Sequence, residues 1–464
     1  MQDRPAARGE SAHSRLFLVR VSLYWLALGG LWSAIGIQMA PVIATRLICP
    51  SEVQGAACSL LPVVQLTPII GQLRLRPEIA ISVVGLIGAV VAFVVQPVAA
   101  ALSDFTRSRL GRRRPWIIGG TGLSVMILLG LAASDTFVAF AVLGWSLQLS
   151  SNLAQGPYQG YVPDLVPKPQ VGMASGLVAM MSTAGQLVGV GVAALAIGLG
   201  EPRLGFIALA ILLAVTVLPT VLRVDDRGDP LPRSSGSRLG GARAAVAEAW
   251  AHRSFVWFLV SRLFILMGTA TLVFSAQFLL TRSLGYSEAE AAGAIVALLT
   301  ITVLSAIVVT AWAGPASDRY GRRSIIWLGC ASSAVGLAVI AAGPGELELS
   351  LAGLRFPLAG LGAVSVGVGT GMFLAADWAL LVDIIPKPTA GRYTGISNIA
   401  TASAGAIASI AAGLVMATTT DLTADAALGP RLAVVGGLAW LAIGAFTLRA
   451  VDPRPWDGRG DQEG

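Results

Sequence analysis

The sequence predicts an all-α membrane protein with 12 transmembrane helices arranged as two six-helix repeats. Three observations lead to this prediction. The chain is 55% hydrophobic but only 12% charged, which is roughly half the charge of an ordinary soluble protein. It contains twelve apolar segments, each close to the roughly 20 residues that a helix needs to cross a bilayer. Its second half also repeats short polar motifs of its first half.

The apolar segments follow one another along the chain and define its domains. The predicted spans are 17–45, 79–101, 116–134, 137–161, 171–199, 204–222, 255–281, 290–313, 325–343, 355–382, 393–417 and 431–450. Residues 223–253 are rich in Arg, Asp, Ser, Gly and Pro, a composition that cannot bury a core. We therefore predict a cytoplasmic N-terminal tail (1–16), an N-terminal half (17–222), a cytoplasmic linker (223–253), a C-terminal half (254–450) and a cytoplasmic tail (451–464).

The basic residues predict the orientation. With the N-terminus inside, 24 of the 32 Lys and Arg residues fall on the cytoplasmic side, seven fall outside, and Arg262 lies within a span. This bias places both termini in the cytoplasm of a multi-pass protein of the cell membrane. Residues 1–15 are polar, so no cleavable signal peptide is expected. Because the positive charge sits in short loops, the expected partner is the lipid bilayer and not a nucleic acid.

Each half carries the same polar loop between its second and third spans. The first loop, Ser103–Pro115, and the second loop, Gly314–Arg323, lie about 210 positions apart. Carboxylates can pair with neighbouring arginines and accept bonds from helix amides, so we predict gating loops that latch the two halves in one state. The alternative is that the arginines only enforce topology. The candidate gating residues are Asp104, Gly111, Arg112, Arg113, Arg114, Asp318, Arg319, Gly321, Arg322 and Arg323.

A second repeated motif follows spans four and ten. Pro163–Pro169 corresponds to Val382–Pro388 with a constant offset of 219 residues, which pairs Asp164 with Asp383. Each aspartate lies at the cytoplasmic end of a span and is followed by a lysine four residues later. We predict that both aspartates form ion pairs at helix ends or at a gate.

Span four carries a polar stripe that includes Gln148, Asn152 and Gln155. Their spacing of four and three residues places them on one helical face. Amides offer neutral hydrogen-bond donors and acceptors, and Tyr158 adds an aromatic surface. We predict that this face binds the substrate; hydrogen bonding between helices is the alternative.

Other polar residues within spans also favour a functional role, because such side chains are costly at membrane depth. Arg262 in span seven can extend to the surface or pair with Asp377 in span ten. This pair is the candidate for ion coupling. Gln38, Gln277, Asp377 and Trp378 complete the predicted substrate-binding set.

The remaining chemistry is sparse. Cys49 and Cys58 lie in the first outside loop, where an oxidising environment permits a disulfide. Cys330 lies within a span. No spacing fits a metal site, no cofactor motif occurs, and no nucleophile–base pair suggests an enzyme.

The duplicated loop resembles the signature loop of the major facilitator superfamily. This resemblance implies the major facilitator fold, with the substrate near the bilayer midplane between two halves that rock against each other. The length of Ser103–Pro115, together with Gln155-Gly156-Pro157, is similar to the plant sucrose–proton symporters and to the glycoside–pentoside–hexuronide group. The implied substrate is a sugar or glycoside in a cavity lined by span four.

The chain departs from that group at its coupling residues. The sucrose symporters have an aspartate seven residues before Gln155, where this chain has Gln148, which cannot take up a proton. The melibiose-type members keep acidic residues in span two, and residues 79–101 contain none. Either coupling relies on Asp377 or the protein is a uniporter, so proton, sodium and no coupling all stay open.

Two other functions remain as alternatives. An exporter of drugs or metabolites is less favoured, because span five lacks the Gly-Pro pair of the drug–proton antiporters. A non-transporting sensor or a pigment-handling relative would usually carry a longer cytoplasmic segment. We expect a monomer that moves a small polar solute, and the direction of transport is open.

Overall fold

The computed structural model describes residues 14–48, 64–65, 72–73, 76–167, 170–224, 250–342, 348–351, 354–385 and 390–452. Cys49, Cys58, Lys168 and Lys387, most of the 223–253 linker and most of both tails lie outside these ranges. Among the described residues, 12 helices are long and apolar enough to cross a membrane. The predicted all-α membrane fold is therefore confirmed.

The first half consists of six spans, the first of which is built from four consecutive helical segments. In chain order its elements are α1 (Arg15–Ser22), α2 (Tyr24–Ser33), the π-helical turn η1 (Ala34–Met39), α3 (Ala40–Ile48), the short strands β1 (Val64–Gln65) and β2 (Gln72–Leu73), α5 (Pro77–Ser103), α6 (Arg114–Ala132), α7 (Phe137–Gln159), α8 (Tyr161–Leu165), α9 (Val171–Gly198) and α10 (Arg203–Arg223).

The second half also has six spans, but its strand pair lies between its third and fourth spans instead of between its first and second. Its elements are α12 (Arg253–Phe278), the π-helical turn η3 (Leu279–Ser283), α13 (Glu288–Tyr320), α14 (Arg322–Ala341), the strands β3 (Glu348–Leu351) and β4 (Leu354–Pro357), α15 (Leu358–Ile384), α16 (Ala390–Thr423), α17 (Leu428–Thr447) and the 3-10 turn η5 (Leu448–Ala450). Strands β1 and β2 pair antiparallel, as do β3 and β4.

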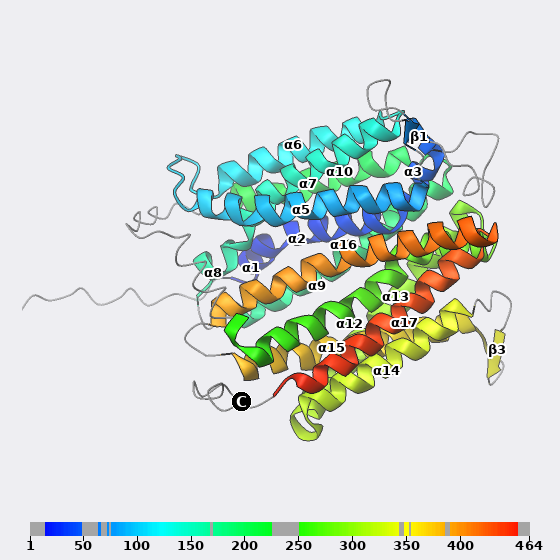
Figure 1. The fold of residues 1–464 in the computed structure, drawn as a ribbon. Coiled ribbons are helices and arrows are strands. Elements are labelled where there is room, and N and C mark those ends of the chain that lie inside the picture. Colours follow the sequence, from blue (N-terminus) through cyan, green and yellow to red (C-terminus); the bar gives the residue numbers. More distant parts are fainter. Residues whose placement is uncertain are drawn as a thin grey trace, which may run out of the picture.

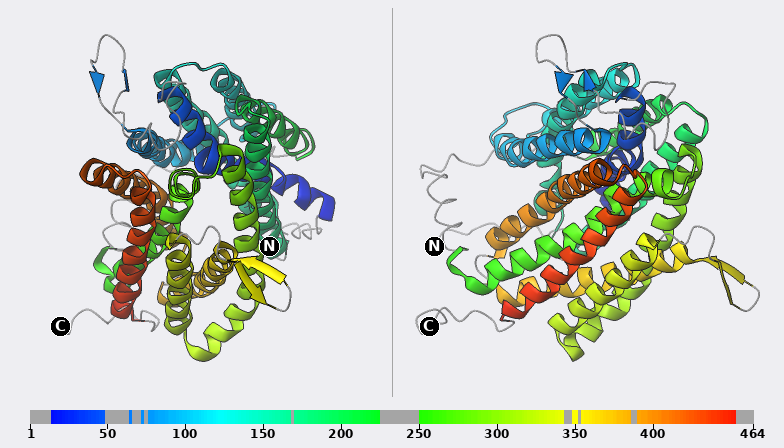
Figure 2. Two further views of the ribbon diagram at one scale, coloured as in Figure 1. Left: turned by 90° about the vertical axis from the view of Figure 1, so that its right-hand side faces the viewer. Right: turned by 45° about the vertical axis from the view of Figure 1, so that its right-hand side comes forward.

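The spans form one elongated bundle with two distinct ends (Figure 1). We call the end with the α5–α6 and α13–α14 connections the loop end, and the end with the two strand pairs the hairpin end. The start of α1 and the end of α17 both lie at the loop end. Seen from the hairpin end, the helices of the two halves stand as two groups (Figure 2).

Each half has its own hydrophobic core, and the outer surface is apolar as well. One core cluster consists mainly of residues from the first half, and a second consists of residues from the second half. Leu195, Leu222 and Val308 are each about two-thirds exposed or more. A large exposed apolar surface of this kind is the expected outer face of a helical bundle in lipid.

Glycines let α2 and α9 approach closely in the first half. A Cβ atom on Gly185 would lie 2.1 Å from the carbonyl oxygen of Leu26, and one on Gly189 would lie 2.1 Å from that of Gly30. Small residues allow this backbone contact between membrane helices. The tight pairing fixes the neighbouring Ser182 and Gln186 of α9 beside α2.

Two boundaries differ from the prediction in ways that matter for function. The second polar loop is mostly helical, since α13 continues to Tyr320 and only Gly321, with a φ of 89°, separates it from α14. The second span begins at Pro77 and not at residue 79, so it contains Glu78, whose side chain is fully buried. A proline at the first position of a helix sets the helical φ angle, which explains the earlier start.

Candidate transport cavity and ion pairs

A cavity of about 760 Å³ lies between the two halves. Helices α2, α3, α5, α6, α7 and α9 and turn η1 line it from the first half, and α12 and α16 line it from the second. Its polar lining side chains are Ser33, Gln148, Gln155, Ser182, Gln186, Thr269, Thr401 and Ser409, and its aromatic ones are Trp25, Trp32, Phe140 and Phe274. Among the described lining residues none is ionisable.

Gln148 is held in a defined orientation on the α7 wall of the cavity. Asn152 Nδ2 donates to Gln148 Oε1 at 3.1 Å and to the Gln148 backbone carbonyl at 2.8 Å. On the other side lies Gly88 of α5, where a Cβ atom would approach Gln148 Nε2 to 3.3 Å. Because the amide oxygen is already bonded to Asn152, Gln148 can offer its NH2 group to a ligand.

Aromatic side chains complete the first-half wall. Trp25 lies near the start of α2 and Trp32 near its end, and both line the cavity. The Trp25 ring packs against Tyr158, with 5.7 Å between ring centroids. An indole beside amide groups provides a flat apolar surface together with directional hydrogen bonds.

The second-half wall is mainly apolar and leads to a buried ion pair. Arg262 Nη1 contacts Asp377 Oδ2, with side chains 9% and 4% exposed. Arg262 Nε also donates to Thr401 Oγ1 at 3.2 Å, and Thr401 lines the cavity. The structure therefore pairs Arg262 with Asp377, which was one of the two expected alternatives. The hydroxyl group of Thr401 links this pair to the cavity.

Several predicted substrate-binding residues lie elsewhere. Gln38 is fully buried and donates to the backbone carbonyl of Ala292 at 3.1 Å. Tyr158 is 1% exposed and donates to the Val21 carbonyl. Gln277 is buried and outside the cavity lining, and Trp378 is 52% exposed on the bundle surface. Asn152 supports Gln148 without lining the cavity, so the predicted set keeps Gln148 and Gln155 as lining residues.

Sequence reasoning missed Ser182, Gln186 and Trp25. Ser182 and Gln186 are four residues apart in span five and therefore share a helical face. That spacing was a usable signal, whereas nothing in the sequence set Trp25 apart from a tryptophan packed against lipid.

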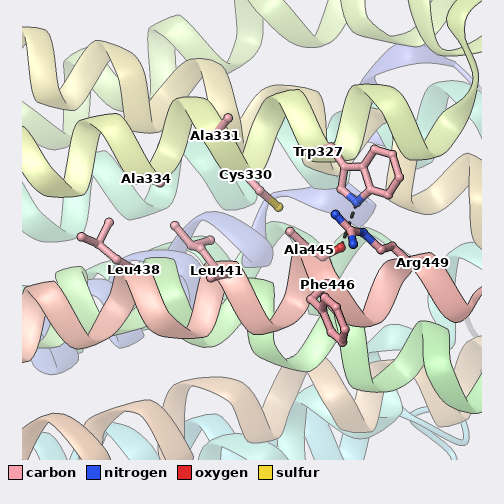
Figure 3. Close-up of a pocket in the computed structure, with 10 residues that line it drawn as sticks. Trp327, Cys330, Ala331, Ala334, Leu438, Leu441, Ala445, Phe446 and Arg449 are labelled. Atoms are coloured by element: carbon pink, nitrogen blue, oxygen red, sulfur yellow. Dashed lines mark hydrogen bonds between the residues drawn. The ribbon is translucent and has the colours of Figure 1, made fainter.

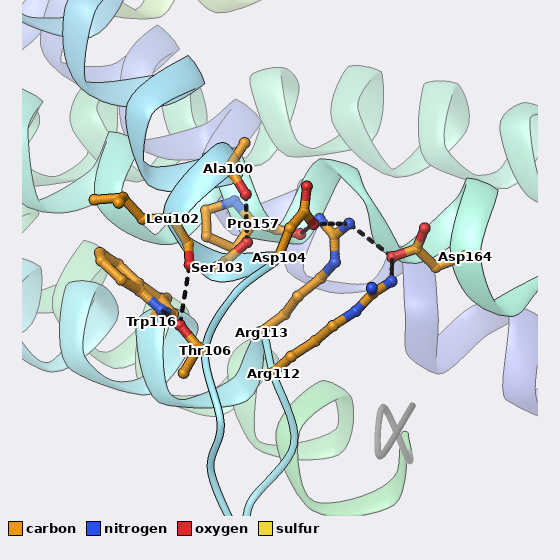
Figure 4. Close-up of polar contacts among 10 residues, drawn as sticks. All are labelled: Ala100, Leu102, Ser103, Asp104, Thr106, Arg112, Arg113, Trp116, Pro157 and Asp164. Carbon is orange, nitrogen blue, oxygen red and sulfur yellow. Dashed lines mark hydrogen bonds and ion pairs between the residues drawn. The ribbon is translucent and has the colours of Figure 1, made fainter. Parts of the chain in front are cut away.

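The first repeated loop forms an ion-pair cluster at the loop end (Figure 4). Arg113 Nη2 lies 2.9 Å from Asp104 Oδ1 and 2.7 Å from Asp164 Oδ2, and Arg113 Nη1 donates to the Pro157 carbonyl at 2.8 Å. Arg112 also pairs with Asp164. The cluster thus joins the end of α5, the start of α6 and α8, all within the first half.

The second half contains a corresponding cluster. Arg322 Nη1 lies 2.5 Å from Asp318 Oδ1, and Arg322 Nε donates to Asp383 Oδ2 at 3.1 Å. In this conformation the described contacts of both clusters tie together elements of their own half. Asp164 and Asp383 therefore form the expected helix-end ion pairs, with arginine as the partner.

The other predicted gating residues surround these clusters. Gly111 has a φ of 111° in the first loop, and Arg114 donates to the Val224 carbonyl. The Arg319 guanidinium lies 5.4 Å from the Tyr320 ring centroid. Gly321 and Arg323 lie where α13 ends and α14 begins.

Polar contacts between the halves occur at the hairpin end. Arg46 pairs with Glu288 at 2.6 Å, Arg282 pairs with Glu78 at 3.0 Å, and Arg76 pairs with Asp421. Ser82 Oγ donates to the Ser409 carbonyl at 2.7 Å, and Gln38 reaches Ala292 as described above. These contacts hold the two halves together at that end.

A smaller hollow of about 420 Å³ lies between α14 and α17 (Figure 3). Trp327 Nε1 donates to the Ala445 carbonyl at 2.8 Å across it. Phe446, which also lines the hollow, is 66% exposed. The hollow therefore belongs to the outer surface of the second half, and the cavity between the halves is the better candidate for a transport site.

Comparison with known proteins identifies the family to which this twelve-helix fold belongs. The sequence profile of the Major Facilitator Superfamily matches residues 21–409. The chain belongs to this superfamily. It is therefore a multi-pass membrane protein of this superfamily, and the resemblance inferred from the repeated loops is confirmed.

Individual relatives are more distant. The sucrose transport protein SUC4 of Arabidopsis thaliana is 30% identical over 142 residues, which cover 27% of this chain and 28% of that protein. The chain thus matches only about a quarter of that relative's length. Among solved structures, a variant of the nucleoside transporter NupG aligns with a TM-score of 0.70 at 14% identity, covering 94% of this chain and all of the other. The D-xylose–proton symporter aligns with a TM-score of 0.66 at 16% identity, covering 95% and 98%.

Proposed function

We propose that this transporter moves an uncharged sugar or glycoside across the membrane by alternating access. The observation that carries the proposal is the composition of the cavity between the halves. Its described lining combines three glutamines, hydroxyl groups and two tryptophans without an ionisable side chain. A neutral polyhydroxyl ligand matches such a wall, because each hydroxyl can both donate and accept while an indole covers an apolar ring face.

The absence of charge among the described lining residues also narrows the substrate class. A carboxylated sugar such as a hexuronate would bring a negative charge into the cavity, where a buried charge requires a partner such as arginine. Arg262 is the nearest candidate on α12, but Asp377 already pairs with it. The partial likeness to a sucrose transport protein is a further reason to prefer neutral sugars over acidic ones.

Ion coupling, if present, is proposed to act through Asp377. Protonation of this carboxylate would release Arg262, which is bonded to Thr401 at the cavity wall. Asp377 would then communicate with the bound ligand through the Arg262 guanidinium and the Thr401 hydroxyl. Gln148 in the opposite wall is an amide and has no role in proton transfer.

A nucleoside is the second candidate substrate class. It is also uncharged, and a base could stack on Trp25 or Trp32 while its ribose bonds to the amides. Because the likeness to NupG is a likeness of fold, the cavity composition is the only support for this candidate.

We further propose that the loop end faces the cytoplasm and that the protein works as a monomer in the cell membrane. Arginine-rich segments favour the cytoplasmic side. The two ion-pair clusters would stiffen each half so that it moves as a unit, and a latching contact between them would belong to another conformation.

The test is uptake of radiolabelled solutes by proteoliposomes, with and without an inward proton gradient. The panel contains neutral mono- and disaccharides, a hexuronate and nucleosides. Accumulation of a neutral sugar that depends on the gradient, and that is lost in Asp377→Asn reconstituted as monodisperse, folded protein, would support proton symport. Gradient-independent equilibration would make the protein a uniporter. Transport of the hexuronate alone, or of no sugar, would refute the proposal.

A further inference from the structure

The first span of each half contains a π-helical turn close to the hairpin end, η1 in the first half and η3 in the second. Each turn supplies one side chain that crosses to the second span of the opposite half. Gln38 of η1 donates to the Ala292 carbonyl of α13 at 3.1 Å, and Arg282 of η3 donates to Glu78 Oε2 of α5 at 3.0 Å. Isolated π turns in helices are frequent at functional sites.

The two crossings join equivalent elements of the two halves but differ in their chemistry. Gln38 makes a neutral bond to a backbone carbonyl, whereas Arg282 and Glu78 form an ion pair with side chains 4% and 0% exposed. The Arg282 guanidinium also lies 4.6 Å from the Phe278 ring centroid. Two charges held this far from water are stable only while they stay paired.

The ion pair is buried but incompletely bonded. Among the described groups, neither Glu78 Oε1 nor Arg282 Nη1 has a hydrogen-bond partner. A single N–H···O contact is weaker than the bidentate arginine–carboxylate geometry. The pair is therefore strong enough to require both charges, yet it can separate without breaking a larger network.

The neighbouring ion pairs at this end are more exposed. Asp421, which pairs with Arg76, is 64% exposed, and Arg46 and Glu288 are 40% and 34% exposed. Solvent-exposed pairs contribute little to stability because water screens them. Among the described contacts between the halves, the Glu78–Arg282 pair therefore makes the main electrostatic contribution to keeping the hairpin end closed.

We propose that the Glu78–Arg282 pair is the charge-specific latch of the hairpin end. Opening this end moves α5 away from η3 and breaks the pair; closing it requires both charges to be present and to meet again. This inference rests on the proposed alternating-access transport, but it concerns the gate and not the identity of the solute.

A conformational measurement tests the latch without any substrate. Ser82 lies one helical turn after Glu78, is 2% exposed and bonds across the interface to Ser409. A cysteine is introduced there after the three native cysteines are replaced by serine. The rate of labelling by a membrane-impermeant maleimide, added from the hairpin side of sealed vesicles, then reports opening of that end.

Glu78→Gln or Arg282→Gln leaves one buried charge without its partner and should accelerate labelling by roughly a hundredfold. The matched control is Asp135→Asn, because Asp135 pairs with Arg203 within the first half and is 77% exposed. Labelling of this control should equal that of the parent protein.

Exchange of the two charges, Glu78→Arg with Arg282→Glu, should slow labelling again relative to either single variant. Unchanged labelling in single variants that elute as monodisperse protein would overturn the latch, as would a double variant no slower than the singles. If the parent transports no sugar while the single variants still label faster, the substrate proposal fails and the latch stands.

Discussion

Gln148→Leu is the most direct test of the cavity as a substrate site. Leucine has a similar volume but cannot donate a hydrogen bond. Gln148 lines the cavity, and its amide oxygen is bonded to Asn152 Nδ2. Asn152 keeps its second bond, to the backbone carbonyl of residue 148 at 2.8 Å, so α7 should fold normally. The substitution therefore removes the amide that the ligand would contact and little else.

The size of the effect follows from a single neutral hydrogen bond. A bond of this kind contributes about 0.5–1.5 kcal/mol, and a buried hydroxyl left without its partner costs about 1–3 kcal/mol. With about 1.4 kcal/mol for each tenfold change in affinity, Gln148→Leu should weaken sugar binding roughly 2- to 150-fold. The higher values apply if the ligand hydroxyl that faces residue 148 has no water to replace the amide.

Binding of the transported sugar to detergent-purified protein, measured by isothermal titration or by quenching of tryptophan fluorescence, gives this ratio. Gln96→Leu is the matched control, because Gln96 lies on the adjacent helix α5 and outside the described cavity lining. An unchanged dissociation constant in Gln148→Leu would refute the assignment of the cavity. Equal weakening in both variants would point to a general effect on packing.

Two further predictions concern the ion pair and the closed interface. Asp377→Asn leaves Arg262 buried and unpaired, and should lower the free energy of unfolding by about 3–5 kcal/mol. Thermal unfolding in detergent measures this loss, and adding Arg262→Leu should recover part of it. A double variant whose destabilisation equals the sum of the two single variants would contradict this explanation. Gly413→Ala places a Cβ atom 2.6 Å from Ser82 Oγ of the opposite half, and should slow transport by hindering closure of the hairpin end. Gly436→Ala is the control, because no atom lies within 4 Å of the added Cβ, and it should transport like the wild type. Equal transport rates for the two variants would show that the close approach at Gly413 is not needed.

The fold could be predicted because its main determinants are local. Twelve apolar segments each have to satisfy their backbone groups as helices in lipid, and the repeated motifs reveal the duplication. Asp164 and Asp383 could likewise be expected at helix ends, since both follow a span directly. Their arginine partners lie about 50 to 60 residues earlier, at or just before the start of the third span of each half, so the pairing itself depended on how the spans of each half pack.

The residues of the site were harder to predict, because they depend on which side of each helix faces the cavity. Gln148 and Gln155 line the cavity, while Tyr158, which was expected to add an aromatic surface beside them, donates to the Val21 carbonyl of α1. A stripe along one helix defines a face but does not say which part of that face meets another helix. Glu78 illustrates a boundary effect, because a shift of two residues in the predicted start of span two hid the buried acid.

The sequence by itself determined the membrane class, the number of spans, the duplication and the superfamily, since hydropathy and repeated motifs are properties of consecutive residues. Only the tertiary structure decided which polar groups meet. It placed Arg262 against Asp377, separated Gln38 from the cavity, and brought Glu78 and Arg282, 204 residues apart, into one buried pair. The physical reason is that these contacts join different helices, so their partners depend on helix rotation and on the conformational state of the two halves, and neither is encoded in the periodicity of a single span.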